Sequence, residues 1–418
     1  MISRVKGTQD FCNLTFFNII VDSFKKHASL YSFTEIATPI LEPFELFHRS
    51  LGEFTDVVSK EMFFIQTNND KERICLRPEA TASTVRAFIE NGIQKTPWKV
   101  FSYGPMFRYE RPQKGRFRQF HQINMELIGT KSSFDDVQLV YMLDRYFSEK
   151  LLLTNYTLSL NYLGCTNDRK QYIQILTNFL LSNTAASICA TCKVRATHNS
   201  MRVFDCKQEQ CQLVYKNAPV ITDCLCVDCS QEWHEIKKNF NTLTVTFTHN
   251  PHLVRGLDYY NKTVFEFSSN QLGAQNAFCG GGRYDSLVKE VGGKHDQPAI
   301  GAALGIERII LLLEAQHNQS LMTKPEPLVY IVPMSNNQQT LALIIASTLR
   351  AHTIATDINF SGSSIKSMMR AADKAEAQYV LIIGDDEQNN STVMVKDMIK
   401  GTQQSVEQRK LVEFIKQQ

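Results

Sequence analysis

The first third of the chain mixes helical and strand-like spacing of its apolar residues. An apolar stripe in Phe16–Tyr31 recurs every three or four positions, which predicts an amphipathic helix. Two stretches, Trp98–Tyr103 and Phe120–Ile128, alternate apolar and polar residues as strands do. Pro112 and Gly115 interrupt the segment between them, so that segment is expected to be a loop. The pattern therefore predicts a β-hairpin, and Phe120, Gln122, Asn124 and Glu126 fall on one face of its second strand.

Shorter elements continue this mixture along the chain. Further strands are predicted at residues 61–66, 73–76, 156–163, 243–247 and 263–267, and further helices at 84–89, 135–152, 167–181 and 309–313. From 167 to 240 the pattern is helical and polar, and strands resume only after it. We therefore expect a helical block inserted into a strand-rich domain.

Two prolines, Pro39 and Pro43, mark the extended segment 34–43. Proline has no backbone N–H to donate, which excludes this segment from a central position in a sheet. We expect an edge strand or an interface there.

The spacing changes after Lys324–Pro327, a proline-marked stretch that predicts a linker. Strands are then expected at 328–332, 355–360, 379–383 and 391–395, and helices at 338–350, 364–377 and 405–415. This alternation is typical of a compact α/β domain. From Pro325 onward the chain carries nine Lys and Arg against ten Asp and Glu, so this domain is not basic overall.

The composition is that of a soluble globular protein, with 418 residues, 43% hydrophobic and 21% charged. This length predicts two or three domains. The net charge of +3 is too small for bulk nucleic-acid binding, so any polyanion has to meet a local patch. No apolar run reaches the roughly 20 residues needed to cross a bilayer, and Met1–Gly7 has no signal or transit leader. We expect a cytoplasmic protein without a membrane partner.

The loop of the predicted hairpin carries most of the candidate chemistry. The eleven residues from Arg108 to Arg118 hold five basic side chains and one acid. Arginine offers a planar, permanently charged fork that binds phosphate through two hydrogen bonds, and an aromatic ring such as Phe120 can stack on a base. Taken alone, the loop is also explained as a solvated basic surface.

Three other segments place chemically active side chains beside turns. The turn at Leu76–Ser83 sets a carboxylate and a hydroxyl near a helix start, which fits either a helix cap or a ligand site. The segment Leu253–Tyr260 combines an arginine, an acid and two tyrosines with one glycine, and Phe278–Asp285 contains three adjacent glycines. Small residues from Pro298 onward run into a helix that begins near Arg308, where helix N-termini favour anions.

The eleven cysteines favour free thiols or metal ligands over disulfides in a cytosolic protein, and seven of them lie between 167 and 240. Two C-x2-C pairs, Cys189/Cys192 and Cys226/Cys229, suit one tetrahedral structural zinc site. The gap between the pairs is longer than in compact zinc ribbons, and a set of reduced, partly buried thiols is the alternative explanation. No metal ligand is assigned from the sequence.

Taken together, these motifs resemble the class II aminoacyl-tRNA synthetases, and within them the histidyl-tRNA synthetase family. The resemblance extends from Lys6–Asp10 to the C-terminus. The matching segments are 39–43, Arg108–Phe120 and Gly301–Arg308 for the three class signatures, and Arg255–Tyr260 and Gly280–Tyr284 for two motifs of the histidine enzymes.

The resemblance implies an α+β fold in which helices flank an antiparallel sheet. It places a catalytic domain at 1–166 and 241–322, a Cys-rich helical insertion at 167–240 and an α/β anticodon-binding domain at 325–418. The implied reaction joins L-histidine to ATP, giving histidyl-adenylate and pyrophosphate, and then transfers histidine to the 3′ end of a tRNA. ATP and Mg²⁺ are the implied cofactors, tRNA is the implied partner, and a homodimer through the segment around Thr38–Pro43 is expected.

The resemblance also assigns ATP-binding residues. Arg108 and Arg255 are expected to be catalytic, because they would hold the α-phosphate and the substrate carboxylate and stabilise the growing charge. Arg116 and Arg308 suit the β- and γ-phosphates. Glu110 is expected to accept a hydrogen bond from the adenine amino group, and Phe120 to stack on the ring.

The histidine pocket has to recognise an imidazole by hydrogen bonds to its ring nitrogens. Candidates for the ring are Glu126, Tyr259 and Tyr260, and candidates for the amino and carboxylate groups are Glu79, Thr81 and Gln122, with Arg108 and Arg255. Ala80 stands where many members of the family have glycine, and we expect no loss of function from its small methyl group.

Two other functions fit parts of the same pattern. A catalytically inactive paralogue that binds histidine and regulates its biosynthesis usually lacks the C-terminal domain and loses phosphate-binding arginines, whereas this chain keeps the domain and all four arginines. Another class II synthetase would not carry the segments Arg255–Tyr260 and Gly280–Tyr284. The sequence therefore favours a histidine–tRNA ligase.

Overall fold

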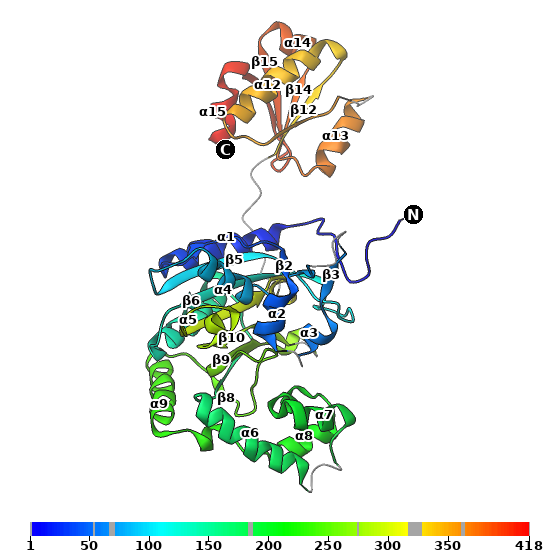
Figure 1. Ribbon diagram of the computed structural model, residues 1–418. Coiled ribbons are helices and arrows are strands. Elements are labelled where there is room, and N and C mark those ends of the chain that lie inside the picture. The colour runs from blue at the N-terminus through cyan, green and yellow to red at the C-terminus, as the bar shows by residue number, and fades with distance from the viewer. Residues whose placement is uncertain are drawn as a thin grey trace. The chain divides into compact units, whose positions relative to one another are not determined.

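The computed structural model describes residues 2–52, 55–66, 72–182, 187–273, 276–316, 328–360 and 364–417. The chain forms two compact units, Met1–Met322 and Thr323–Gln418 (Figure 1). The predicted linker Lys324–Pro327 lies outside the described residues.

An eight-stranded sheet forms the centre of the first unit. Its strands, in spatial order, are β1 (Thr34–Glu35), β5 (Trp98–Phe107), β6 (Gln119–Ile128), β11 (Ala299–Gly305), β10 (Ala277–Arg283), β9 (Asn261–Ser268), β7 (Thr157–Tyr162) and β8 (Thr248–His249). All neighbours are antiparallel except the two outermost pairs, β1 with β5 and β7 with β8. The predicted antiparallel sheet is confirmed, and so is the hairpin, in which Phe107 pairs with Gln119 beside the tip.

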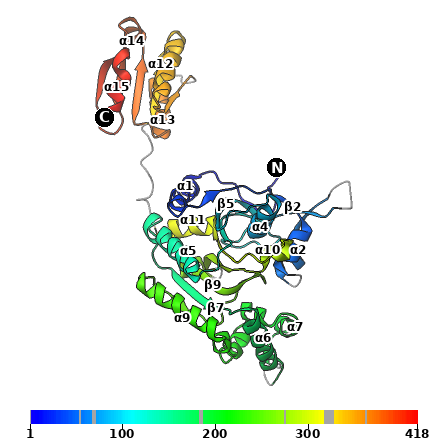
Figure 2. The same ribbon diagram turned by 60° about the vertical axis from the view of Figure 1, so that its left-hand side comes forward.

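The two faces of this sheet differ because side chains alternate along each strand. On β6, Ile123, Met125 and Leu127 point into an apolar core, and Gln122 and Glu126 point to the opposite face. Helices cover the apolar face: α1 (Thr15–Leu30), α5 (Ser133–Arg145) with the π-helix η1 (Tyr146–Lys150), and α11 (Ile306–Ala315). Helices α1 and α11 lie side by side (Figure 2). The opposite face, which carries Gln122 and Glu126, is therefore available for a functional site.

A smaller three-stranded sheet accompanies the large one. It has the order β2 (Leu41–Pro43), β4 (Ile74–Leu76), β3 (Phe63–Ile65), and it packs with α2 (Phe44–Leu51), α3 (Asp56–Lys60), α4 (Thr81–Glu90) and α10 (Leu287–Val291). Strand β2 pairs only with β4 among the described strands, so it lies at an edge, as its prolines predict.

A helical block follows β7 in sequence and leads back to β8 (Figure 1). Its elements are α6 (Thr166–Leu181), α7 (Ala190–His198), the 3₁₀ helices η3 (Ser200–Asp205) and η4 (Ile221–Cys224), α8 (Glu209–Tyr215) and α9 (Val227–Thr242).

The predicted strand at 243–247 is wrong. Thr244 has a φ of 55°, which no strand residue adopts, and the segment turns at the end of α9. The apolar alternation there serves helix packing, because the Val245 N–H donates to the Phe240 carbonyl at 3.0 Å and the Phe240 and Phe247 rings lie 5.7 Å apart. Only Thr248–His249 forms strand β8.

The second unit has its own five-stranded sheet. Its order is β13 (Thr356–Ile358), β12 (Val329–Pro333), β14 (Tyr379–Ile383), β15 (Thr392–Asp397), β16 (Gln403–Glu407). Val329 and Ile331 face α12 (Gln339–Ala351) and α15 (Leu411–Lys416), and Tyr330 and Val332 face α13 (Ile365–Lys374). Short elements complete the two units: η5 (Asn270–Leu272), η7 (Asn336–Gln338), α14 (Asp385–Asn389) and η8 (Gln408–Lys410).

One C-terminal prediction is partly wrong. The expected helix 405–415 begins instead as strand β16, which pairs antiparallel with β15 from Gln403 to Glu407. Helical turns start only at Gln408, and α15 buries Leu411 and Ile415. Because the segment carries few apolar residues before Leu411, its spacing does not separate an edge strand from a helix.

Candidate active site

A polar cleft of about 330 Å³ opens on the polar face of the large sheet, between the hairpin loop and the segment before β9. Eleven of the predicted site residues line it: Glu79, Thr81, Arg108, Glu110, Arg116, Phe120, Gln122, Arg255, Tyr259, Tyr260 and Arg308. The other two, Ala80 and Glu126, are buried behind its wall. The structure thus gathers residues that lie up to 229 positions apart in sequence (308 − 79).

One end of the cleft is strongly basic. Arg108 lies just after β5, where its Nε donates to the Pro78 carbonyl at 3.0 Å and its guanidinium is 5.4 Å from the centre of the Phe120 ring. Arg308, in the first turn of α11, donates from Nε to the Gly115 carbonyl at 3.0 Å. Burial, and then the positive charges of Arg108 and Arg116, lower the pKa of Arg308 to about 10. Such crowding of like charges favours a bound polyanion.

Two carboxylates hold the other arginines in place. Glu110 forms an ion pair with Arg116, which also lies 3.7 Å from Glu61. Glu266, on β9, forms an ion pair with Arg255. Burial opposes the charge of Arg255, but Glu266, Tyr260 and Cys279 together more than offset it, so the pKa of Arg255 is raised and the side chain stays cationic.

The three adjacent glycines are part of strand β10 and do not form a turn. A Cβ on Gly280 would overlap the Arg255 guanidinium, and a Cβ on Gly281 would overlap the Gly301 carbonyl of the neighbouring strand. The glycines therefore leave room for Arg255 above the sheet.

Glu79 acts as a helix cap. Its carboxylate accepts from the Thr81 and Ala82 backbone N–H groups at 2.7 and 2.8 Å at the start of α4, and the side chain also lines the cleft. Ala80 has a φ of −111°, which alanine adopts without strain, so the methyl group in place of glycine leaves the turn intact.

Glu126 lies behind the cleft and is fully buried on β6. It accepts from the Thr81 hydroxyl at 2.7 Å and from the Tyr284 hydroxyl. Burial raises the pKa of Glu126 to about 8, against the lowering effect of these two hydrogen bonds. A Cβ on Gly301 would overlap this carboxylate, which explains a glycine at that point of β11.

The Glu126 end of the cleft is aromatic. The Tyr259 and Tyr260 rings lie 4.5 Å apart, and their hydroxyl oxygens are 3.5 Å apart. Three neighbouring polar groups are buried without a partner among the described residues: Gln122 Oε1, both side-chain amide atoms of Asn124, and Arg255 Nε. Buried polar atoms normally have partners, so these groups indicate a polar ligand.

Sequence reasoning missed several residues that shape the cleft. Glu266 and Glu307 line it, and Tyr284 and Asn124 lie behind it. Asn124 lies on the same face of β6 as Gln122 and Glu126, so the alternation along this strand could have identified it as a site residue. Nothing in the sequence indicates that Glu307 accepts from the backbone N–H and the ring of His121 at 2.9 Å, because these residues are 186 positions apart.

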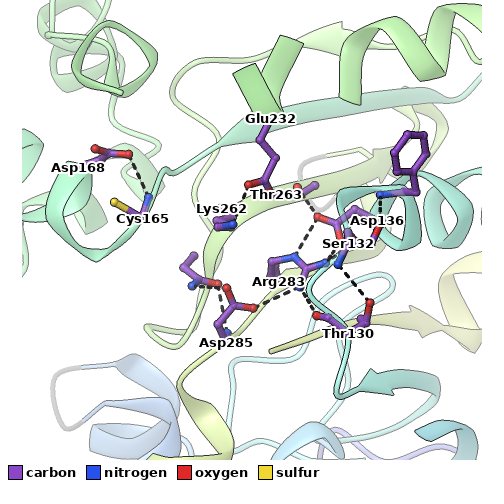
Figure 3. A network of polar contacts seen from close by, with 12 residues as sticks. Thr130, Ser132, Asp136, Cys165, Asp168, Glu232, Lys262, Thr263, Arg283 and Asp285 are labelled. Carbon is purple, nitrogen blue, oxygen red and sulfur yellow. Dashed lines mark hydrogen bonds and ion pairs between the residues drawn. The ribbon is translucent and has the colours of Figure 1, made fainter. Parts of the chain in front are cut away.

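Arg283, within the glycine motif, is structural and is not part of the cleft lining. Figure 3 shows it among its polar partners. Arg283 is 1% exposed, forms an ion pair with Asp136 and donates to the Thr130 and Ser132 carbonyls at 2.8 and 2.9 Å. The Thr263 hydroxyl donates to the same Asp136 carboxylate at 2.6 Å. This network joins β9, β10 and α5 behind the site.

The two C-x2-C pairs do not converge on one site, which corrects the arrangement considered from the sequence. Cys189 and Cys192 lie with Cys206 and Cys211, whereas Cys226 and Cys229 lie with Cys165 and Asp168. Spacing alone reveals each pair, but only the fold of the insertion shows which pairs meet.

An antiparallel sheet with an arginine-lined cleft on one face, followed by a separate α/β unit, is the architecture of a class II aminoacyl-tRNA synthetase. The family model described as histidyl-tRNA synthetase matches residues 18–309, and the model described as anticodon binding domain matches 328–418. The chain belongs to the histidyl-tRNA synthetase family.

Similar proteins support this assignment along the whole chain. The histidine–tRNA ligase of Thermodesulfovibrio yellowstonii is 42% identical over 419 residues, covering 99% of this chain and 98% of the relative. That of Clostridioides difficile is 39% identical, with 95% and 94% covered. The predicted family, fold class and ligase function are confirmed.

Solved structures support the same assignment. The apo histidyl-tRNA synthetase of S. aureus has a TM-score of 0.82 and 30% identity, with both chains fully covered. A Bacillus halodurans protein titled as an ATP phosphoribosyltransferase regulatory subunit/histidyl-tRNA synthetase has a TM-score of 0.64, covers 91% of this chain and 98% of its own, and is 18% identical. At that identity it supports the fold alone and does not favour the regulatory alternative. Within the described residues, the helices lack the length and apolarity needed to span a membrane.

Proposed function

We propose that the cleft activates L-histidine with ATP and then passes the histidyl group to the 3′ end of a tRNA. In the first step the histidine carboxylate attacks the α-phosphate, and pyrophosphate leaves. The observation that carries the proposal is the convergence of four arginines on one cleft whose other end is lined by tyrosines. Reactions at phosphorus depend on positioning and charge neutralisation more than on covalent catalysis, and this lining supplies both.

The basic end of the cleft is the proposed ATP site. Arg108 binds the α-phosphate, and Arg116 and Arg308 bind the β- and γ-phosphates. Arg116 is now paired with Glu110, so ATP exchanges this partner: the arginine moves to phosphate and the carboxylate accepts from the adenine amino group. Phe120 stacks on the adenine ring.

The aromatic end is the proposed histidine site. Tyr259, Tyr260 and Glu126 recognise the imidazole, with Glu126 sharing or giving up one of its two hydroxyl partners. Glu79, Thr81 and Gln122 receive the amino and carboxylate groups, assisted by the neighbouring Ala80 backbone. Arg255, aligned by Glu266, stabilises charge on the reacting carboxylate and phosphate.

Magnesium fits this cleft as a partner of the triphosphate. Among the residues placed by the structure, no group of three acidic, histidine or cysteine ligands gathers in the cleft. Mg²⁺ commonly takes one or two carboxylates together with substrate phosphates and water, and Glu266 lines the cleft as such a carboxylate. When bound, the ion neutralises charge on the β- and γ-phosphates.

The proposed division of labour follows the predicted domains. Residues 1–166 and 241–322 carry adenylation, 167–240 is an insertion, and 325–418 binds the anticodon region of tRNA. Lys366, Arg370 and Lys374 lie exposed along α13, opposite the buried Met368, and form one candidate ridge for RNA.

We also propose a cytoplasmic homodimer that associates through the edge strand β2. Two apolar side chains at this edge are exposed, with relative exposures of 39% for Ile40 and 52% for Leu41. A second copy would cover this apolar edge.

The replacement Arg255→Ala tests the proposal. Losing one charge-stabilising donor costs about 3 kcal/mol in the barrier, so histidine-dependent ATP–pyrophosphate exchange should fall roughly 100-fold or more. The matched control Arg145→Ala removes an arginine that forms ion pairs with Asp144 and Glu149 outside the cleft lining, and it should retain the wild-type rate. A folded Arg255→Ala protein with near-normal exchange would remove Arg255 from the mechanism.

A further inference from the structure

Four cysteine sulfurs meet inside the helical insertion. Cys189 precedes α7 and Cys192 lies in its first turn, Cys206 follows η3, and Cys211 lies in α8. Their four Sγ atoms all lie within 4.8 Å of one another, and three of the four residues are buried. The cluster thus joins two sequence pairs, one of spacing C-x2-C and one of spacing C-x4-C.

We propose that these four cysteines bind one structural Zn²⁺. A tetrahedral zinc with Zn–S bonds of about 2.3 Å has its sulfurs about 3.8 Å apart, and the Sγ atoms of Cys189 and Cys206 are already 3.9 Å apart. Only small side-chain rotations bring the remaining sulfurs to that spacing. A [4Fe–4S] cluster distributes its cysteines over four iron atoms and needs a wider arrangement.

Backbone donors around the sulfurs fit thiolates better than thiols. The Cys189 N–H donates to Cys211 Sγ at 3.2 Å, and the Gln208 N–H donates to Cys206 Sγ at 3.5 Å. A neutral thiol is a weak acceptor, whereas metal-bound sulfur carries negative charge that such donors stabilise. A core filled by small hydrophobic thiols has no need of these donors.

The second cluster, Cys165, Asp168, Cys226 and Cys229, has a different explanation. The Asp168 carboxylate already accepts from the Cys165 and Cys226 backbone N–H groups, both at 3.1 Å, and so caps α6 and α9. Figure 3 shows the first of these bonds. Because this carboxylate has committed partners, the proposal is confined to the four-cysteine cluster.

The zinc would cross-link a part of the insertion that consists of short helices. It joins α7, η3 and α8, which contain nine, six and seven residues. From η3 and its N-cap, Arg202 donates to the Arg255 carbonyl at 3.2 Å and Asn199 to the Asp258 carboxylate at 2.9 Å. The ion thereby supports the loop that carries Arg255, a consequence that rests on the proposed function.

The test measures metal in the full-length protein. The chain is purified without chelator from cells grown with Zn²⁺, and its zinc is quantified by plasma mass spectrometry. We expect about one zinc per wild-type chain and background zinc in Cys206→Ser. The matched control is Cys224→Ser, which alters a cysteine of the same insertion outside both clusters and should retain the metal.

A second measurement does not depend on the variant folding. Replacing zinc by Co²⁺ in the wild-type chain should give the thiolate charge-transfer and d–d absorption of tetrahedral cobalt bound by cysteines. Two zinc ions in the wild type, with one lost in Cys206→Ser, would also support the site.

Three results would overturn the proposal: no zinc and no such cobalt spectrum in the wild type, full zinc retention in Cys206→Ser, or equal zinc loss in Cys206→Ser and Cys224→Ser. None of these readouts depends on activity, so their failure is distinct from failure of the proposed function.

Discussion

Every arginine assigned to catalysis or ATP binding already has an oxygen partner in the protein. Arg108 and Arg308 donate to carbonyls, and Arg116 and Arg255 pair with carboxylates. These contacts fix the guanidinium groups before substrate binds, which lowers the entropy lost on binding. The same contacts give the buried arginines hydrogen-bonding partners, without which burying their charge would cost free energy. Bound ATP has to replace some of these contacts.

The buried carboxyl group of Glu126 leads to a prediction about pH. Its pKa rises from an ordinary value of 4.5 to about 8 because the side chain is buried, so the folded protein holds this proton more tightly than the unfolded chain does. The contribution of Glu126 to stability is therefore fully present below pH 4.5 and is lost as the pH rises through 8. Glutamine at this position does not titrate.

We expect the stability of Glu126→Gln relative to wild type to increase between pH 5 and pH 8, by at most about 1.4 kcal/mol per pH unit. Urea unfolding followed by tryptophan fluorescence measures this, because both tryptophans, Trp98 and Trp233, lie in the first unit. Parallel pH profiles for the two proteins would show that Glu126 does not titrate in this range.

At the scale of elements, the sequence predicted those whose local pattern is unambiguous. The hairpin followed from alternation on both sides of a loop marked by Pro112 and Gly115, and six of the thirteen predicted site residues lie on its loop or its second strand. The strand prediction for 243–247 was wrong because residues that pack against a helix happen to alternate there as strand residues do. The partners of Glu126 could not be predicted, since Thr81 and Tyr284 lie far from it in sequence and only the fold of the first unit brings them together. The grouping of the cysteine pairs likewise depends on the fold of the insertion.

The edge strand β2 carries a prediction about assembly. Leu41 is half exposed at the proposed contact, and a carboxylate there would be buried unpaired in a dimer. We expect Leu41→Asp to convert a dimer to a monomer at micromolar concentration in analytical ultracentrifugation. The control Leu343→Asp alters a leucine of the second unit that is 51% exposed and should leave the dimer intact. A wild-type chain that sediments as an active monomer would contradict the dimer.

The whole molecule consists of two units, each with its own core, and the proposed chemistry lies in only one of them. All the cleft residues precede Glu314, and the second unit is nearly balanced in charge, with nine basic against ten acidic residues from Pro325. A generic polyanion surface is therefore not expected in the second unit, and contact with RNA has to be local.

A chain ending at Thr323 tests this division. We expect it to retain histidine-dependent pyrophosphate exchange, because the cleft is complete, and to lose most aminoacylation of full-length tRNA. The intact chain is the control in both assays. Undiminished charging by the shortened chain would show that the second unit is not the tRNA-binding module.

The cleft is proposed to select histidine and to activate it with ATP. ATP–pyrophosphate exchange with each of the twenty amino acids, supplied singly with Mg²⁺ to the full-length protein, tests this selectivity. A pocket that hydrogen-bonds an imidazole should reject side chains lacking its nitrogens by roughly 10⁴-fold or more. Exchange is expected with histidine alone. Exchange with another amino acid at a comparable rate, or no exchange with histidine by the folded protein, would contradict the proposal.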